Sequence, residues 1–319
     1  MKKASIVQKV IILAVYALLP IIFSHSYQLR LLNLLIFFTM FTLSSNIIFG
    51  HTRQLFLCQG ALVGIGSYIS AILPERLGVA PWIILPVGAL TSAGIGSLIS
   101  AVSSIRRLSI IFMAVLTSSF QVIFGELILG LRHITGADEG IVIRSDILRG
   151  LIGANRELVY YYLLIATLFA TVIIYDKIVN SRVGVAFRCI VEDEIAASFI
   201  GINVVKYKVL SAFISSFLFG FMGGLYAYYN LYICPSMFQN IDVHILVMLV
   251  FGGMGTLTGP LLGAGAFTLI SELLRPLGPI TTLIFGILLI ILFLFFREGL
   301  VVHLKRITGQ FFKKHKLCF

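Results

Sequence analysis

Ionisable side chains inside apolar stretches are the first candidates for chemistry in this sequence. They are Glu126, the neighbouring Asp242 and His244, and Glu272. Such a group is a functional candidate by default, because burying a charge in hydrocarbon is costly. Proton-coupled transport would need a relay of these groups, whereas hydrolysis or group transfer would need a nucleophile beside a base.

Two of these positions also have a structural explanation. Glu126 lies six residues before Arg132 and suits the end of an apolar segment, where solvent is close. Asp242 and His244 open an apolar segment, so we expect them at a solvated helix end. Glu126 is kept among the candidate functional residues, and the structural explanation is kept beside it.

The sequence gives little indication of a catalytic nucleophile or of an ATP-binding site within this chain. The histidine nearest to Cys58 is His51, seven residues away, and Glu272 with Arg275 at i, i+3 fits a local ion pair. No GxxxxGK(S/T) phosphate loop occurs, so we expect no ATP site of that kind here. The four cysteines show neither CxxC nor metal-ligand spacing, so we expect no metal site and no internal disulfide.

The composition indicates a polytopic membrane protein. Hydrophobic residues make up 59% of the 319 and charged residues 12%, against about 25% charged in soluble domains. The formal net charge of +11 could suggest nucleic-acid binding, but the basic residues are scattered between apolar segments and fit charges that orient spans. We therefore expect an all-α transmembrane bundle, one domain over residues 1–319, in contact with membrane lipid and without nucleic acid.

Hydropathy divides the chain into about ten predicted spans. The run 252–263 is too rich in glycine for one plain helix, so we predict a broken or re-entrant element there, covered by protein or water. The predicted spans are Val10–Phe23, Leu29–Phe49, Leu55–Leu73, Trp82–Ser104, Ser109–Leu131, Leu158–Asp176, Val209–Asn230, Asp242–Gly253, Pro260–Leu274 and Pro279–Phe296.

Basic residues orient these spans. With both termini on one side, 17 of the 24 Lys and Arg residues fall on that side, which the positive-inside rule assigns to the cytoplasm. The central loop 177–208 and the basic tail 297–319 are then cytoplasmic, and 132–157 is the largest outer loop.

The central loop contains a predicted short helix outside the bilayer. Asp193 or Glu194 suits the N-terminus of this helix, and Gly201 can close it in the left-handed conformation. At i, i+4 spacing the helix presents an apolar face, which needs either a protein groove or the lipid surface to cover it. The face consists of Ile195, Ala196, Phe199 and Ile200.

Glycines recur where predicted spans must approach one another. In a bilayer such glycines mostly mark tight helix–helix contact, and we favour this interpretation over pore lining. The main groups are Gly60, Gly64 and Gly66, then Gly88, Gly94 and Gly96, then Gly220 and Gly224, and finally Gly255, Gly259 and Gly263.

The central loop resembles the cytoplasmic loop of the branched-chain amino acid ABC transporter permeases, with the LivM-type member of the permease pair as the better match. Three further blocks fit this family in order: Gly60–Tyr68, Thr135–Ile141 and Gly252–Ala264. The loop residues that carry the resemblance are Ser181, Arg182, Gly184, Ala186, Arg188, Ile190, Glu192, Asp193, Glu194, Ala196, Ala197, Gly201, Ile202 and Asn203.

The sequence also departs from the family pattern. The family usually has Ser-Leu-Gly-His-Gly-Ala where this chain has Phe56–Ala61, and Ala137 replaces the second glycine of its outer-loop motif. Val185 stands in place of a usual arginine. The first departure lies near the implied substrate path, so it bears on the substrate more than on the class of transporter.

The resemblance implies one permease of a pair in a bacterial inner membrane. A second permease would complete the translocation path, two cytoplasmic ATPases would dock on the inner loops, and a binding protein would deliver substrate outside. ATP would be used by these partners, and no cofactor would be bound by this chain. Branched-chain amino acids are the implied substrates, with urea or short amides as the alternative.

The resemblance also assigns residues to these roles. The spacing of Ala196 and Ala197 to Gly201 resembles the coupling motif of ABC importers, with Ile195 where many of them have glutamate. This favours a groove on the ATPase as the cover of the apolar face. The implied coupling residues are Arg182, Gly184, Arg188, Glu192, Asp193, Glu194, Ile195, Ala196, Ala197, Phe199, Ile200, Gly201 and Asn203. The candidate residues of the substrate path are Gly60, Gly64, Gly66, Glu126, Gly252, Gly253, Gly255 and Gly259.

Overall fold

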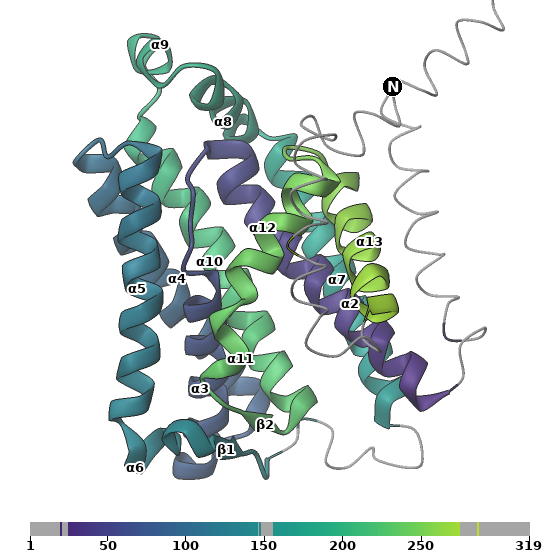
Figure 1. The fold of residues 1–319 in the computed structure, drawn as a ribbon. Helices are drawn as coiled ribbons and strands as arrows, with labels where there is room; N and C mark the ends of the chain where they lie inside the picture. Colours follow the sequence, from purple (N-terminus) through teal and green to yellow (C-terminus); the bar gives the residue numbers. More distant parts are fainter. Residues whose placement is uncertain (1–19, 21–24, 146, 148–155, 275–285, 287–319) are drawn as a thin grey trace, which may run out of the picture.

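The described part of the chain is a bundle of long helices (Figure 1). The computed structural model describes residues 20, 25–145, 147, 156–274 and 286, and these are almost entirely helical. The expected all-α membrane fold is therefore confirmed. The long elements are α2 (Ser26–Ser45) with its π-helical continuation η1 (Asn46–Gly50), α3 (Gln59–Leu77), α4 (Pro81–Ile105), α5 (Ile110–Gly130), α7 (Arg156–Val179), α10 (Val204–Asn230), α12 (Ile241–Gly252) and α13 (Thr258–Leu274).

The helices follow the predicted spans closely within the described residues. Five of them are long and apolar enough to cross a membrane: Ser26–Gly50, Pro81–Ile105, Ile110–Gly130, Arg156–Val179 and Val204–Asn230. Ser236–Gly252 and Thr258–Leu274 are shorter apolar helices. The predicted spans Val10–Phe23 and Pro279–Phe296 lie outside the described residues, as does the tail 297–319, so the count of ten stays a prediction.

Helix α10 lies at the centre of the bundle and packs mainly against α4, α3 and α2. Small residues on α10 allow this close approach, because a Cβ on Gly220 would lie 2.5 Å from Ser92 Oγ of α4. Aromatic rings fill the space towards α2, where Phe37 meets Tyr226 edge-on at 5.2 Å between ring centroids. Helix α5 lies at one edge of the bundle, and most of its large side chains are exposed.

The chain between η1 and α3 is extended and runs between the helices of the bundle before α3 begins (Figure 1), with Phe56 and Cys58 buried. Leu57 donates its backbone N–H to Thr117 Oγ1 at 3.0 Å, and Ala61 donates to Gln121 Oε1 at 2.6 Å. Both acceptors lie in the middle of α5, so α3 starts at mid-depth in the bundle. The predicted span Leu55–Leu73 was therefore wrong over its first four residues, which are not helical.

The glycine-rich run 252–263 forms the turn between α12 and α13 together with the start of α13. The backbone is left-handed at Gly255 (φ +73), and Asn46 of η1 holds the turn by accepting the Gly255 N–H at 2.8 Å. A Cβ on Gly259 would lie 2.1 Å from the Gly253 carbonyl oxygen. The predicted interruption is present, as a turn between two short helices that pack against each other.

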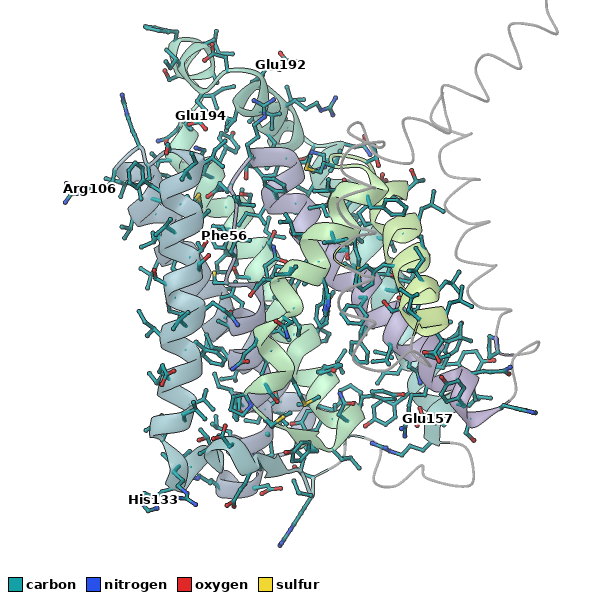
Figure 2. All side chains as sticks on the ribbon, in the orientation of Figure 1. Phe56, Arg106, His133, Glu157, Glu192 and Glu194 are labelled. Carbon is teal, nitrogen blue, oxygen red and sulfur yellow. The ribbon has the colours of Figure 1, made fainter. Side chains whose placement is uncertain are left out.

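The two long loops lie at opposite ends of the bundle (Figures 1 and 2). Glu192, Glu194 and Arg106 mark one end, and His133 and Glu157 mark the other. The first end carries α8 (Arg182–Glu192) and α9 (Glu194–Phe199). The second carries α6 (Arg132–Thr135), η2 (Ala137–Glu139), β1 (Ile141–Val142) and β2 (Tyr232–Ile233). Helix α11 (Ser236–Gln239) follows β2 and lies deeper in the bundle, where Gln121 of α5 donates to the Phe238 carbonyl oxygen at 3.1 Å.

The two short strands close the second end of the bundle. They pair antiparallel, with Ile141 opposite Ile233 and Val142 opposite Tyr232. The opposite placement of the two loops fits the predicted topology. Which end faces the cytoplasm stays a prediction.

Candidate functional site

The loop between α7 and α10 is built from two capped helices. Asp193 Oδ1 accepts the backbone N–H groups of Ile195 and Ala196 at 2.7 and 3.1 Å, which begins α9. Ser181 caps α8 in the same way, since its Oγ accepts the Val183 N–H at 3.1 Å. These caps satisfy amide groups that have no partner within the helix. Of the two predicted N-terminal residues, Asp193 is the cap.

Gly201 ends α9 as predicted. Its φ is +85, the left-handed conformation that glycine adopts at least cost. The Gly201 N–H donates to Ser198 O at 3.1 Å, and the Ile202 N–H donates to Ala197 O at 3.1 Å. This pair of bonds is the Schellman arrangement, which satisfies the last helical carbonyl groups.

The predicted apolar face of α9 is exposed. The exposed fractions are 70% for Ile195, 86% for Phe199 and 69% for Ile200, and Ala196 is exposed beside them. Ala197 points the other way and is buried at 2%. Within the described residues, nothing covers this face.

Two side-chain contacts attach the two helices to the bundle, and a third bond caps the helix that follows them. Lys208 Nζ of α10 lies 2.6 Å from Glu194 Oε1, which ties α9 to α10. Arg188 of α8 donates to the Val179 carbonyl oxygen at 2.9 Å. Asn203 Oδ1 accepts the Lys206 N–H at 3.0 Å and caps α10.

The remaining coupling residues of α8 divide into one buried and two exposed positions. A Cβ on Gly184 would lie 2.1 Å from the Val179 carbonyl oxygen, so only glycine fits this close approach of α8 to α7. Arg182 and Glu192 are exposed.

A buried polar cluster, which the sequence did not indicate, lies at the same end of the bundle. Asn46 donates to the Tyr175 hydroxyl at 2.8 Å and to the Thr256 carbonyl oxygen at 2.7 Å. His51 Nε2 lies 2.7 Å from the same Tyr175 hydroxyl. The cluster joins η1, the α12–α13 turn and α7, which leads directly into α8.

The prediction of a solvated helix end for Asp242 was wrong. Asp242 is only 5% exposed, and its Oδ1 accepts the Gly60 N–H at 2.9 Å. Gly60 is the second residue of α3, so the carboxylate satisfies one of the free amide groups at an interior helix N-terminus. A negative charge at this position also suits the positive end of the helix dipole.

The candidate glycines of the substrate path mostly pack against the chain itself. A Cβ would lie 2.1 Å from Phe238 O at Gly60, 2.6 Å from the Phe124 ring at Gly64 and 2.0 Å from Gly220 O at Gly66. At Gly252 it would lie 2.0 Å from Gly259 O. These distances support the helix-packing interpretation, and a role of these glycines along a substrate path stays a prediction.

The two glutamates singled out in the sequence both lie towards the surface. Glu126 is exposed on α5, outside the interior of this chain. Glu272 accepts a hydrogen bond from the Tyr27 hydroxyl at the start of α2. The predicted partner of Glu272, Arg275, lies outside the described residues.

The described residues offer no cluster of three or more His, Cys, Asp or Glu side chains that could hold a metal ion. Cys58, Cys189 and Cys234 are free thiols. The exposed apolar face of α9 is the feature of the loop end that suits binding to a protein surface.

Comparisons with known proteins agree with this geometry. Residues 27–296 match the family described as "Branched-chain amino acid transport system / permease component". The LivM permease proteins of Salmonella typhimurium and Escherichia coli are each 26% identical over 283 residues, which cover 81% of this chain and 66% of the relative.

An archaeal relative extends the match to the other permease type. The probable LivH permease protein of Methanocaldococcus jannaschii is 26% identical over 216 residues, covering 64% of this chain and 66% of the relative. The chain thus spans about two thirds of the length of these curated relatives. No solved structure matches. Because the family match extends over most of the described helices, the chain belongs to the permease components of branched-chain amino acid transport systems.

Proposed function

We propose that this chain is one of two permease subunits of an ATP-driven importer that carries branched-chain amino acids into a bacterial cell. The relatives are named as permease proteins of branched-chain amino acid transport systems, which supports this substrate class over urea or short amides. Two ATPase subunits bind at the α8–α9 end, which faces the cytoplasm, and a binding protein delivers substrate at the other end.

The single observation that carries the proposal is the exposed apolar face of α9. Fully burying a large apolar side chain stabilises a complex by about 1.5–3 kcal/mol. Because Ile195, Phe199 and Ile200 are each more than two thirds exposed, a protein groove could recover on the order of 1–2 kcal/mol from each. The Asp193 cap, the turn at Gly201 and the Lys208–Glu194 ion pair hold this face in place before any partner binds.

The charges around α9 favour a protein groove over the lipid surface. Helices that lie on membranes carry Lys and Arg on their polar face, which attract anionic lipids. Helix α9 has neither residue, and the acidic run Glu192, Asp193 and Glu194 leads into its first turn. Anionic headgroups would repel this segment, whereas a groove with basic side chains would attract it.

Energy for transport comes from the partner ATPases in this proposal. The sequence has no phosphate loop of its own. The buried carboxylate of Asp242, which a proton-coupled carrier would use, is already bound to the α3 amide group of Gly60. A structural role accounts for this carboxylate without a proton relay.

The test compares two exposed apolar residues at opposite ends of the bundle. Phe199→Ser removes the centre of the α9 face, and Val142→Ser changes β1, where the side chain is 66% exposed. We expect Phe199→Ser to lose the co-purifying ATPase subunits and ATP-dependent leucine uptake, with normal membrane abundance. Val142→Ser keeps both. Uptake that survives ATP depletion and stops when the proton gradient collapses would refute the proposal.

A further inference from the structure

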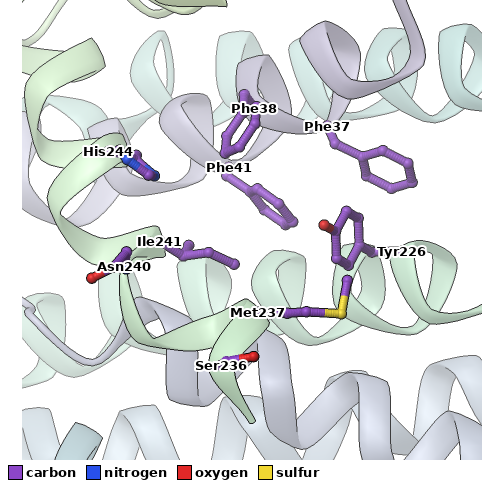
Figure 3. A pocket seen from close by; sticks show the side chains of 9 residues that line it. All are labelled: Phe37, Phe38, Phe41, Tyr226, Ser236, Met237, Asn240, Ile241 and His244. Atoms are coloured by element: carbon purple, nitrogen blue, oxygen red, sulfur yellow. The ribbon is translucent and has the colours of Figure 1, made fainter. Parts of the chain in front are cut away.

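A cavity of about 250 Å³ lies between α2, α10 and the α11–α12 segment (Figure 3). Its α2 wall lies in the middle of the apolar span Ser26–Gly50, and its α10 wall lies one turn from the outer end of that helix. The lining residues are Phe37, Phe38, Phe41, Tyr226, Ser236, Met237, Asn240, Ile241 and His244.

The walls of the cavity differ in polarity. One wall is aromatic, because Phe37 and Phe41 of α2 face Tyr226 of α10 (Figure 3), with ring centroids 5.2 and 6.4 Å from the tyrosine ring. Met237 and Ile241 extend the apolar surface from α11 and α12. The ligand-facing surface on this side suits a branched or linear hydrocarbon group.

The polar groups lie along one edge. Asn240 and His244 are four residues apart and face the cavity from successive turns. Neither side chain makes a hydrogen bond to another residue in the described part of the chain. The His244 ring packs against the rings of Phe38 and Phe267, with centroids 6.5 and 5.3 Å apart. Their amide and imidazole groups are therefore available to the polar groups of a ligand.

Size and charge limit what the cavity can hold. A cavity of about 150 Å³ accommodates benzene, whereas pockets for drug-sized molecules start at about 300 Å³. The volume therefore suits a molecule of roughly leucine's size. None of the nine lining residues is Asp, Glu, Lys or Arg, so a ligand with a charged side chain would find no counter-charge.

From these features we infer that the cavity is a binding site for an amino acid with an uncharged apolar side chain, which enters between Phe38, Phe41 and Tyr226. The amino and carboxylate groups of the ligand then lie at the Asn240–His244 edge. This inference rests on the proposed function. It adds to that function a selective binding site that lies within the membrane-spanning part of this subunit.

The experiment uses the complete importer in nanodiscs and photo-leucine, the diazirine analogue of leucine, as the probe. We expect light-dependent labelling of peptides that contain Phe38 or Met237, suppressed by excess leucine and unaffected by excess glutamate. Labelling of other peptides alone would overturn the inference. So would labelling that leucine does not suppress, because a lipid chain or another segment of the protein would then fill the cavity.

Two variants change the cavity in opposite directions. Met237→Trp fills the cavity from its rim and should lower labelling by photo-leucine about tenfold. Phe38→Ala enlarges the cavity and should raise phenylalanine uptake relative to leucine uptake by about tenfold, the size of effect that small changes in an apolar pocket produce. The matched control is Phe169→Ala on α7, a side chain that is 48% exposed and outside the cavity, which keeps the wild-type ratio.

The outcomes separate this inference from the proposed function. If the wild-type importer takes up leucine with ATP but neither variant changes labelling or selectivity, the site is refuted and the function stands. If the wild-type importer takes up no leucine while labelling is suppressed by leucine and lost in Met237→Trp, the site stands and the proposed transport activity is refuted.

Discussion

Replacing Gly66 by alanine tests whether the central helices depend on backbone contact. A Cβ on Gly66 would lie 2.0 Å from the Gly220 carbonyl oxygen and 2.6 Å from Gly220 Cα. Since ordinary Cβ contacts begin near 3.4 Å, α3 and α10 would have to separate by more than an ångström. The same movement strains the next turn, where Ser67 Oγ donates to the Gly223 carbonyl oxygen at 2.7 Å.

The expected cost combines two opposing effects. Inserting a methyl group into a packed interior costs about 1–3 kcal/mol, whereas alanine is favoured over glycine in a helix by up to about 1 kcal/mol. Gly94→Ala on α4 is the matched control, because no atom lies within 4 Å of a Cβ there. The helix preference is common to both variants, so their difference in unfolding free energy should be about 1–3 kcal/mol.

Thermal unfolding of the detergent-purified chain, followed by the fraction that remains monomeric in size-exclusion chromatography, measures this difference. We expect the melting temperature of Gly66→Ala to be several degrees lower than that of Gly94→Ala. The melting temperature of Gly94→Ala should equal or slightly exceed that of the wild type. Equal melting temperatures for the two variants would show that α3 and α10 do not meet at Gly66.

Three further predictions follow from the loops and the interior. Gly201→Val should cost about 1–2 kcal/mol locally, because a β-branched residue is strained at positive φ. The variant should insert normally but lose ATPase retention and uptake. Gly201→Asn should keep both, because asparagine tolerates this conformation. Full activity of the valine variant would contradict the role of α9. Asp242→Ala should lower stability by about 1–3 kcal/mol by leaving the Gly60 amide group unpaired, and Asp242→Asn should restore most of it together with uptake; loss of uptake in a stable Asp242→Asn protein would instead indicate proton relay. In intact cells lacking the native cysteines, Asp138→Cys should react with an impermeant thiol reagent and Ser198→Cys should not, and the reverse pattern would invert the topology.

The parts of the structure predicted from sequence are those set by neighbours along the chain. Asp193 and Gly201 bracket α9 because a cap and a left-handed glycine act within three or four residues of the helix they end. The apolar face of α9 follows from i, i+4 spacing in the same way. Hydropathy located the long helices because each of them must be apolar along most of its length.

The interior start of α3 could not be predicted, because its partners are remote in sequence. Leu57 and Ala61 pair with Thr117 and Gln121, which are 60 residues away. Asp242 pairs with Gly60 across 182 residues. Hydropathy averaged along the chain shows only an apolar run in both places. It therefore extends the predicted span at Leu55 and assigns the carboxylate of Asp242 to a solvated helix end.

Glycine shows most directly why residue type alone does not assign a role in this chain. At Gly66 the absence of a side chain lets two backbones touch, as the 2.0 Å distance to Gly220 shows. At Gly201 the space around a Cβ is empty, and φ of +85 is what excludes other residues. At Gly94 neither restriction applies, although Ala93, Gly96 and Ser97 beside it in the sequence are also small. The three positions therefore respond differently to the same substitution: alanine disrupts packing at the first, strains a turn at the second and is accepted at the third.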